Sequence, residues 1–464
     1  MNEPVTIIPA LAPGRSTARP GPLRTPQDTA GITMNGFFQP PHQRRSDRCI
    51  FTICTRSYIG LAEALRLSMR NNGVVSDFLI VAVDHAPVDV SAQSGTIVSA
   101  QEFCGYSDAE WASRTFKYDL VELCTSIKAR VFRSAFALGY EKAIYFDPDI
   151  IVFDDLGGVF GALDIHDAVA TPHRLGTESS LSARGGVFNL GFLAARRGAA
   201  IEKVMTWWDE RLDHYSINDP LRGYFTDQKW MDHLPVLLRN DQLLVSDHPG
   251  MNLAPWNLAE RELRGKDGRW EVRLREDGAV WQKLCFVHFS AFDYRGLAAG
   301  KTIAAAGPAE EKMPGFGALL DVLAHGLKRG GFLEHAAIPY QFATYSDGTL
   351  VLAGHRRIYH RLIEAGRDLP APFETGGGFH ARLKRAGLLA AAGGKPSGRP
   401  DAKTRTAQIG RAAKALDILA RIVVRLFGYN RFELLSKLLV RYFHPVNHAR
   451  LLRDRDGSVD VEYF

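Results

Sequence analysis

Apolar runs of strand length alternate with helix-period patterns over the first half of the chain. Residues 49–55 form a short β-rich run, and residues 78–83 form a continuous apolar run typical of a strand buried on both faces. Between them, apolar side chains over residues 59–69 recur at helical spacing, and Gly73 follows as a helix C-cap. A strand, a helix and a strand joined by short connections predict an α/β fold with a doubly wound sheet.

A helical pattern over residues 116–138 leads into a second apolar run, 143–153, which two carboxylates interrupt. Asp147 and Asp149 are two positions apart, so in extended chain both point to the same side and can face one cation. Pro148 cannot donate a ladder hydrogen bond, so the strand should break there and expose both carboxylates at its carboxyl end. Open α/β sheets bind ligands at that end. An acidic turn is the alternative interpretation.

The remaining strand-like runs are short and lie at 167–171, 185–194, 243–245 and 285–289. A helix is expected after the run 185–194, from residue 200 to about 211. Small residues in the run 185–194 would let a ligand approach the backbone closely. The last run contains His288 near its end. This places a candidate metal-binding imidazole at a second strand end.

Composition divides the chain into five segments. Pro, Arg, Gly, Ser and Thr dominate residues 1–47, which predicts disorder, and glycine clusters in residues 376–403 predict flexibility. The predicted segments are a disordered tail at 1–47, an α/β domain at 48–300, a mainly helical extension at 301–375, a flexible linker at 376–403 and a basic amphipathic helical tail at 404–464.

Charge and cysteine content narrow the class of protein. The 464 residues are 46% hydrophobic and 23% charged, which are globular values. A net charge of +6 suits an anionic substrate or a membrane surface, and no aromatic-interleaved basic patch indicates nucleic-acid binding. Five widely spaced cysteines without a Cys-x-x-Cys pair indicate reduced thiols. With no signal-like start and no long apolar run, a cytoplasmic location is expected.

The tail carries an amphipathic pattern over residues 404–445. Leu416, Leu419 and Ile422 fall on one helical face, and Arg421 and Arg425 supply positive charge. One interpretation is packing against the α/β domain. The other is peripheral contact with an anionic membrane, at the inner face of the cytoplasmic membrane.

The polar residues at the strand ends indicate a hard-cation site beside a phosphate-binding crevice. Asp147, Asp149 and His288 are the candidate ligands, and Thr55 and Ser57 lie at the mouth of the first strand. Carboxylate oxygens suit Mg²⁺ or Mn²⁺, and an imidazole favours Mn²⁺. Such a cation neutralises the charge that develops as a nucleotide diphosphate leaves.

The run from Tyr145 to Ile150 resembles the Asp-x-Asp signature of GT-A-fold, nucleotide-sugar-dependent glycosyltransferases. The order from Phe51 to Phe289 is most similar to the family that contains glycogenin and the bacterial lipopolysaccharide galactosyl- and glucosyltransferases. The other matches are the opening strand, Phe188-Asn189-Leu190-Gly191, Asp227-Gln228 and Val287-His288-Phe289.

This resemblance implies a Rossmann-like GT-A domain, with residues 301–375 shaping the acceptor side. It also implies hexosyl transfer from a nucleotide-diphosphate sugar, a UDP-sugar, to a glycan, lipid-linked or cell-envelope acceptor, with Mn²⁺ or Mg²⁺ as the cofactor. Asp227 would contact sugar hydroxyls, and Gln228 would lie beside the anomeric carbon. The implied donor-binding residues are Thr52, Thr55, Ser57, Asp147 and Asn189, together with Lys128 or Arg130 as alternatives for holding the nucleotide or the donor sugar.

Two departures mark a divergent relative. Lys229 stands where the family usually has a second aspartate, and residues 289–293 replace the family's glycine and lysine after the histidine. The diphosphate-binding lysine is therefore missing at its expected place. The family retains anomeric configuration, whereas an inverting enzyme would need a carboxylate base, for which Asp227, Asp232 and Asp293 are candidates.

Two other functions fit parts of the pattern. A phosphatase of the haloacid dehalogenase class also has an apolar strand that ends in Asp-x-Asp. A transferase-like fold kept as a non-catalytic binding or scaffold protein is the second alternative. Covalent phosphorylation of Asp147 would indicate the phosphatase, and an Asp149→Ala chain that still functions in the cell would indicate the scaffold.

Overall fold

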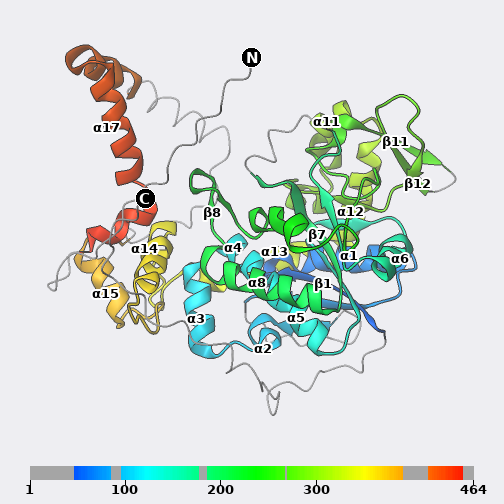
Figure 1. Cartoon of the computed structure of the whole chain (residues 1–464), viewed down its shortest axis with the longest axis horizontal. Coiled ribbons are helices and arrows are strands. Elements are labelled where there is room, and N and C mark those ends of the chain that lie inside the picture. The colour runs from blue at the N-terminus through cyan, green and yellow to red at the C-terminus, as the bar shows by residue number, and fades with distance from the viewer. Residues whose placement is uncertain (1–45, 85–95, 177–184, 267–268, 390–415, 453–464) are drawn as a thin grey trace, which may run out of the picture. The chain divides into compact units, whose positions relative to one another are not determined.

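The computed structural model of the protein describes residues 46–84, 96–176, 185–266, 269–389 and 416–452 (Figure 1). The predicted disorder of residues 1–47 therefore falls almost entirely outside the described residues. A seven-stranded sheet in the order β10-β6-β7-β4-β1-β2-β3 forms the centre. Its strands are β1 (Arg48–Cys54), β2 (Asp77–Ala82), β3 (Thr96–Ser99), β4 (Lys142–Phe146), β6 (Ala168–Pro172), β7 (Phe188–Arg196) and β10 (Leu243–Val245).

Only β7 runs against its neighbours in this sheet. It pairs antiparallel with β4 and β6, whereas the other adjacent pairs are parallel. The predicted α/β class and mostly parallel sheet are confirmed. Because β7 is reversed, its amino end lies at the same sheet edge as the carboxyl ends of β1, β2 and β4.

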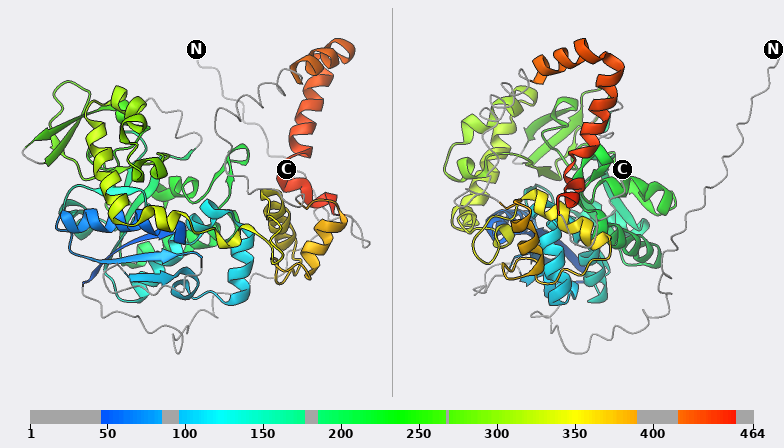
Figure 2. Two further views of the ribbon diagram at one scale, coloured as in Figure 1. Left: turned by 180° about the vertical axis from the view of Figure 1, so that it is seen from behind. Right: turned by 90° about the vertical axis from the view of Figure 1, so that its left-hand side faces the viewer.

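Helices cover both faces of the sheet (Figures 1 and 2). Alternate residues of β1 point to opposite faces, as the strand period requires. Ile50 packs in a cluster with residues of α1 and α6, while the Phe51 ring lies 4.8 Å from that of Phe132 in α5. The helices around the sheet are α1 (Ile59–Asn71), α2 (Ala100–Cys104), α3 (Asp108–Lys117), α4 (Leu120–Ser126), α5 (Lys128–Ala137), α6 (Gly157–Ile165) and α8 (Ala199–Tyr215).

The helical pattern predicted over residues 116–138 is divided between three helices. Tyr118 is extended, with φ −109° and ψ 143°, so α3 ends before it. Asp119 then begins α4 with a capping box that includes Glu122. A second break at Ile127 makes Lys128 the first residue of α5. The apolar period alone did not reveal these breaks, because capping interrupts the backbone without disturbing the apolar stripe.

A second set of strands closes over one end of the sheet. β5 (Ile150–Val152) pairs antiparallel with β14 (Phe286–His288), and His288 lies opposite Ile150. The part of the chain that directly precedes β14 forms a separate antiparallel sheet of β11 (Arg261–Lys266), β12 (Arg269–Leu274) and β13 (Gln282–Lys283). The shorter elements are η2 (Arg56–Tyr58), β8 (Asn218–Asp219), η3 (Pro220–Arg222), β9 (Tyr224–Phe225), η4 (Lys229–His233), α9 (Leu234–Leu237) and η5 (Leu258–Glu260).

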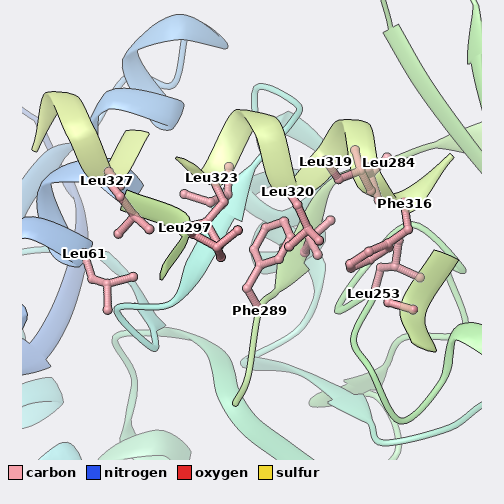
Figure 3. Packing of buried hydrophobic residues seen from close by; sticks show 14 of the residues in the cluster. Leu61, Leu253, Leu284, Phe289, Leu297, Phe316, Leu319, Leu320, Leu323 and Leu327 are labelled. Atoms are coloured by element: carbon pink, nitrogen blue, oxygen red, sulfur yellow. The ribbon is translucent and has the colours of Figure 1, made fainter. Parts of the chain in front are cut away.

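Helices after residue 293 pack directly on this core. Leu320 and Leu323 of α12 are buried in a cluster that also contains Leu61 of α1 and Phe289 (Figure 3). A Cβ at Gly60 would lie 2.4 Å from the Phe332 Cα, so α1 and α13 can approach this closely only with glycine there. These helices are α10 (Tyr294–Ala298), α11 (Thr302–Lys312), α12 (Phe316–Arg329) and α13 (Phe332–Ala336).

The C-terminal helices form another apolar cluster beside α3. α14 (Ala353–Glu364), α15 (Gly378–Arg385) and η7 (Pro445–Leu451) contribute to it, and η6 (Gln341–Ala343) precedes them. The linker prediction is wrong for Gly378–Arg385, because Phe379 and Leu383 are buried. The remaining helices lie at 416–427 and α17 (Tyr429–Tyr442). No described helix has the length and apolar character needed to cross a membrane.

Candidate metal centre

The acidic pair lies at the break between β4 and β5. β4 ends at Phe146, and Asp147 donates its backbone N–H to Gly191 O of β7 at 2.8 Å. Ile150 N–H then donates to Asp147 O at 3.1 Å, which closes a turn around Pro148. The chain leaves the central sheet here and pairs with β14. The predicted break at Pro148 is therefore present, with both carboxylates at the sheet edge.

The β5–β14 pairing brings a histidine from far along the chain to this edge. Phe289 N–H donates to Asp149 O at 2.9 Å, which fixes His288 beside the acidic turn. His288 Nε2 lies 3.2 Å from Asp149 Oδ1 and 3.7 Å from Asp147 Oδ2. The three ligand atoms lie within 4.8 Å of one another. Two carboxylate oxygens and one imidazole nitrogen are a suitable donor set for Mn²⁺ or Mg²⁺.

The charges at this centre depend on one another. Burial disfavours the charged form of His288, but Asp149 and then Asp147 outweigh it and raise the pKa of His288. Burial likewise opposes the charge of Asp149, but His288 and the Tyr294 hydroxyl lower the pKa of Asp149 below its usual value. The two carboxylates therefore attract positive charge to this position, and either a proton or a divalent cation can supply it.

A buried lysine lies beneath the acidic pair. Lys128 is 2% exposed, and its Nζ lies 2.8 Å from Asp227 Oδ2 and 3.7 Å from Asp147 Oδ1. It also donates to Leu190 O at 2.8 Å. Burial disfavours its charge, but Asp227 and Asp147 outweigh that effect and raise the pKa of Lys128. Lys128 is therefore a buried cation that fixes two of the predicted site carboxylates.

Arg130, the alternative to Lys128 in the sequence analysis, points to another partner. Its Nε lies 2.6 Å from Asp209 Oδ2 on α8. Its guanidinium also stacks over the Tyr106 ring, 5.2 Å from the centroid. These contacts join α5 to α8 and account for Arg130 without a ligand.

Two predicted residues with amide side chains, Asn189 and Gln228, form hydrogen bonds next to the candidate metal centre. Asn189 Oδ1 lies 3.1 Å from His288 Nδ1 and accepts from Asn252 Nδ2 at 3.2 Å. Gln228 Oε1 accepts from Leu190 N–H at 3.0 Å, and its amide nitrogen donates to Gly185 O at 2.6 Å. Asp227 and Gln228 are nearly buried, at 2% and 7% exposure. The structure thus joins Asn189 and Gln228 through the start of β7.

The small residue Gly191 allows His288 to approach β7. A Cβ at this position would lie 2.4 Å from His288 Cε1 and 2.9 Å from Asn189 Oδ1. The close approach expected at the run 185–194 is present, but the approaching group is a histidine of the same chain.

The predicted hydroxyl residues surround the end of β1. Thr55 Oγ1 and Ser57 Oγ are 2.8 Å apart, and Thr52 Oγ1 is buried with no hydrogen-bond partner among the described residues. Asp84, after β2, accepts from Arg56 N–H at 2.7 Å. Asp84 was not among the predicted site residues, although its position directly after the apolar run 78–83 places it at the carboxyl end of a predicted strand.

The segment after His288 supplies another unpredicted residue. Tyr294 begins α10, and its hydroxyl lies 2.8 Å from Asp149 Oδ2 and 2.6 Å from Phe289 O. Asp293 caps α10 by accepting from Gly296 N–H at 2.9 Å. No sequence signal pointed to Tyr294, because its contact depends on how α10 packs against the acidic turn.

Comparison with known sequences gives one partial match. A scan against protein-family models finds no match. An uncharacterized protein of Bacillus subtilis (strain 168), YfnF, is 28% identical over 159 residues. The matched region is 33% of this chain and 50% of YfnF, so this chain spans about half the length of the curated relative.

Several solved structures that this chain resembles are glycosyltransferases. The galactosyltransferase LgtC, in complex with donor and acceptor sugar analogues, is 14% identical over 63% of this chain and 98% of its own, with a TM-score of 0.35. GlyE of Streptococcus pneumoniae TIGR4 is 15% identical over 43% of this chain and 46% of its own, with a TM-score of 0.28.

Proposed function

We propose that this protein is a metal-dependent glycosyltransferase that uses a nucleotide-diphosphate sugar, a UDP-sugar, as its donor. The acceptor we propose is a glycan, a lipid-linked molecule or a cell-envelope component. The observation that carries this proposal is the cluster of Asp147, Asp149 and His288, whose ligand atoms lie within 4.8 Å at the ligand-binding edge of the sheet. The donor set fits Mn²⁺ or Mg²⁺.

A divalent cation bound there would neutralise negative charge on the diphosphate as it leaves. The chain's own residues hold the centre ready for it. Lys128 keeps Asp147 and Asp227 paired with a buried cation, while Asn189 orients the His288 ring. The hydroxyls of Thr55 and Ser57, at the end of β1, are proposed to approach the base and ribose.

We propose transfer with retention of configuration. Each candidate carboxylate base already has a partner: Asp227 pairs with Lys128, Asp232 accepts from Val187 N–H at 2.6 Å, and Asp293 caps α10. Occupied carboxylates favour a route that needs no general base. Gln228, which we propose beside the anomeric carbon, has a neutral amide and so fits such a route. Proton NMR of the first-formed product tests this proposal, and a β-linked product from an α-linked donor would contradict it.

A thermal-shift panel of nucleotide sugars, with and without Mn²⁺, tests the donor and the metal together. We expect one nucleotide sugar to raise the unfolding temperature of the full chain only when Mn²⁺ is present. The Asp149→Ala variant should lose that dependence because it lacks one candidate ligand. Asp154→Ala is the matched control. Asp154 lies shortly after β5, and its carboxylate pairs with Lys283 Nζ at 3.4 Å.

Detection of a phosphoaspartate and of nucleotide release, together with this panel, separates the two other functions. A phosphatase would show no protection by any nucleotide sugar and would form a covalent phosphoaspartate at Asp147. A binding or scaffold protein would be protected by a ligand but would release no nucleotide in the presence of acceptors.

We further infer that residues 416–443 attach the protein to an anionic membrane that carries the acceptor, at the inner face of the cytoplasmic membrane. The helix at 416–427 and α17 join at Gly428, and no residue of α17 is buried. Half of the exposed large apolar side chains of the described residues lie on this segment. They are Leu416, Ile418, Leu419, Ile422, Leu426, Phe427, Tyr429, Leu434, Leu435, Leu438, Leu439, Val440, Tyr442 and Phe443.

The charges of this segment favour a lipid surface over a second copy of the chain. It contains five Lys or Arg residues and two acidic residues. Glu433, Lys437 and Arg441 are spaced four apart, so they form one stripe on α17 beside its apolar face. A second copy would bring the same positive charges together, whereas anionic headgroups complement them. The chain beyond this segment is docked, because Ala449 and Leu452 pack in the cluster with α14.

Vesicle sedimentation of the full chain tests the membrane proposal. We expect binding to vesicles that contain phosphatidylglycerol, weaker binding at high salt, and little binding to phosphatidylcholine alone. The double variant Leu426→Asn and Leu438→Asn should bind at least about tenfold more weakly. Leu221→Asn is the control, because Leu221 is more exposed than Leu426 and Leu438 but lies in η3. The membrane proposal is wrong if the double variant binds the vesicles as strongly as the wild type does. It is also wrong if the wild type is a dimer and the double variant is a monomer, because the apolar face would then join two copies of the chain.

A further inference from the structure

Each candidate ligand at the metal centre has one atom facing its neighbours and a second atom held by another residue. In Asp147, Oδ2 faces His288 Nε2 at 3.7 Å. The other oxygen, Oδ1, accepts a short hydrogen bond from the Tyr145 hydroxyl and lies 3.7 Å from Lys128 Nζ. Asp147 therefore offers a single oxygen to a cation.

Asp149 repeats this arrangement with a tyrosine from the opposite side. Its Oδ1 faces His288 Nε2 at 3.2 Å, while Oδ2 lies 2.8 Å from the Tyr294 hydroxyl. A phenol hydroxyl is protonated at neutral pH, so Tyr294 can donate to Asp149 Oδ2, and Phe289 O at 2.6 Å is a second acceptor for the same proton. Turning both oxygens of Asp149 toward the centre would break the bond to Tyr294.

His288 completes the pattern. Its Nδ1 lies 3.1 Å from Asn189 Oδ1, and that oxygen also accepts from Gly191 N–H at 3.2 Å. Because a carboxamide oxygen only accepts, Nδ1 carries the proton and Nε2 is left with a lone pair when the ring is neutral. Three residues thus present two oxygens and one nitrogen.

We propose that the hydroxyls of Tyr145 and Tyr294 make this centre selective for a small six-coordinate cation, Mn²⁺ or Mg²⁺, against Ca²⁺. Ca²⁺ takes six to eight oxygen ligands and often binds a carboxylate through both oxygens. Mg²⁺ takes single oxygens at shorter distances and keeps positions for water and phosphate. Two carboxylates held to one oxygen each suit the smaller ions. This proposal rests on the metal centre of the proposed function, and it names Tyr145 and Tyr294 as positioning residues.

The Tyr294→Phe variant tests the proposal by titration calorimetry of the full chain with Mn²⁺ alone and with Ca²⁺ alone. Loss of the hydroxyl frees Asp149 Oδ2, so we expect the Mn²⁺ affinity to fall about tenfold. The Ca²⁺ affinity should fall less or rise, because a two-oxygen mode becomes available. The ratio of Mn²⁺ to Ca²⁺ affinity should therefore fall, a change that general loosening of the site would not produce.

A matched control removes a comparable hydroxyl away from the centre. Tyr359 is buried, and its hydroxyl lies 3.1 Å from Ser113 Oγ and 3.3 Å from Leu369 O. Tyr359→Phe should leave the metal affinity ratio unchanged, and Tyr145→Phe should lower it as Tyr294→Phe does. If both site variants keep the wild-type ratio within about twofold, well short of the loss expected for such a partner, the selectivity proposal is wrong. If the wild type binds neither ion, the metal centre itself fails, and with it the metal dependence of the proposed transferase.

Discussion

Lys128 and Arg130 are close in sequence and both basic, yet the fold gives them different roles. Lys128 lies under the acidic pair at 2% exposure, whereas Arg130 pairs with Asp209 near the surface. The helix break at Ile127 turns Lys128 toward the sheet edge. A sequence pattern that treats the two as alternatives cannot choose between them, because the choice depends on where α5 begins.

This difference predicts unequal effects on stability. Lys128→Met should lower the free energy of unfolding by about 3–5 kcal/mol, because it leaves Asp227 and Asp147 without their buried countercharge. Arg130→Met should cost about 1 kcal/mol or less, since Arg133 still pairs with Asp209 at 3.2 Å. Urea denaturation of both variants measures the two costs, and similar costs would contradict the role assigned to Lys128.

Gly191 is the second residue whose role depends on close packing. Gly191→Ala would place a methyl group 2.4 Å from His288 Cε1, so the imidazole must move away from Asp149. We expect a fall of about tenfold or more in Mn²⁺ affinity, as for other losses of ligand orientation. Gly158→Ala in α6 is the control, because a Cβ there meets no atom within 4 Å. It should leave Mn²⁺ affinity unchanged and stabilise the helix slightly.

At the scale of elements, the β5–β14 pairing assembles the centre. The acidic pair lies near the middle of the α/β region and His288 near its end, and antiparallel register places His288 opposite Ile150. The sequence predicted a strand at 285–289 and an apolar run that continues after Pro148, but no feature of either run indicated that the two would pair. The pairing is determined by the apolar faces of β5 and β14, where Val152 and Phe286 share one cluster and Ile151 and Val287 share another.

Helix α12 belongs to the same core, although it lies beyond the predicted domain boundary at residue 300. Leu320→Ala should lower the free energy of unfolding by about 2–5 kcal/mol, because Leu320 is fully buried against residues of the central region. Val322→Ala, on the exposed side of the same helix, should change it by about 0.5 kcal/mol or less. A cost for Leu320→Ala as small as that for Val322→Ala would indicate a separately folding extension.

At the scale of the whole molecule, buried histidines couple stability to pH. Burial, followed by Lys117 and Arg357, holds the pKa of His360 well below its usual value, and burial also lowers the pKa of His173, His248 and His355. Such groups bind protons more readily in the unfolded chain. Their effect is absent above about pH 6.5, the ordinary histidine pKa, and reduces stability as pH falls below it.

The unfolding temperature should therefore decrease between about pH 6.5 and pH 5. His288 acts in the opposite direction, because its raised pKa favours folding at low pH. A His360→Gln variant should lose less stability over this interval than the wild type, since one buried neutral histidine is removed. Thermal unfolding at several pH values measures both curves, and parallel curves would show that His360 does not contribute.

The sequence by itself determined the main strands, the first helix and the candidate ligands. Apolar periodicity located the main strands and α1, and the carboxylates around Pro148 and the late His288 were recognisable as metal-binding residue types. These features are local, because strand period, proline chemistry and side-chain type act over a few residues.

Only the tertiary structure decided what surrounds the ligands. The Tyr294 hydroxyl beside Asp149 and the buried position of Lys128 come from elements far apart in sequence, and α15 occupies part of a segment whose glycines indicated a linker. Long-range packing sets which atoms face the metal centre and which are held by hydrogen bonds. No pattern within one segment records those contacts, because each one depends on the position of another segment in the folded chain.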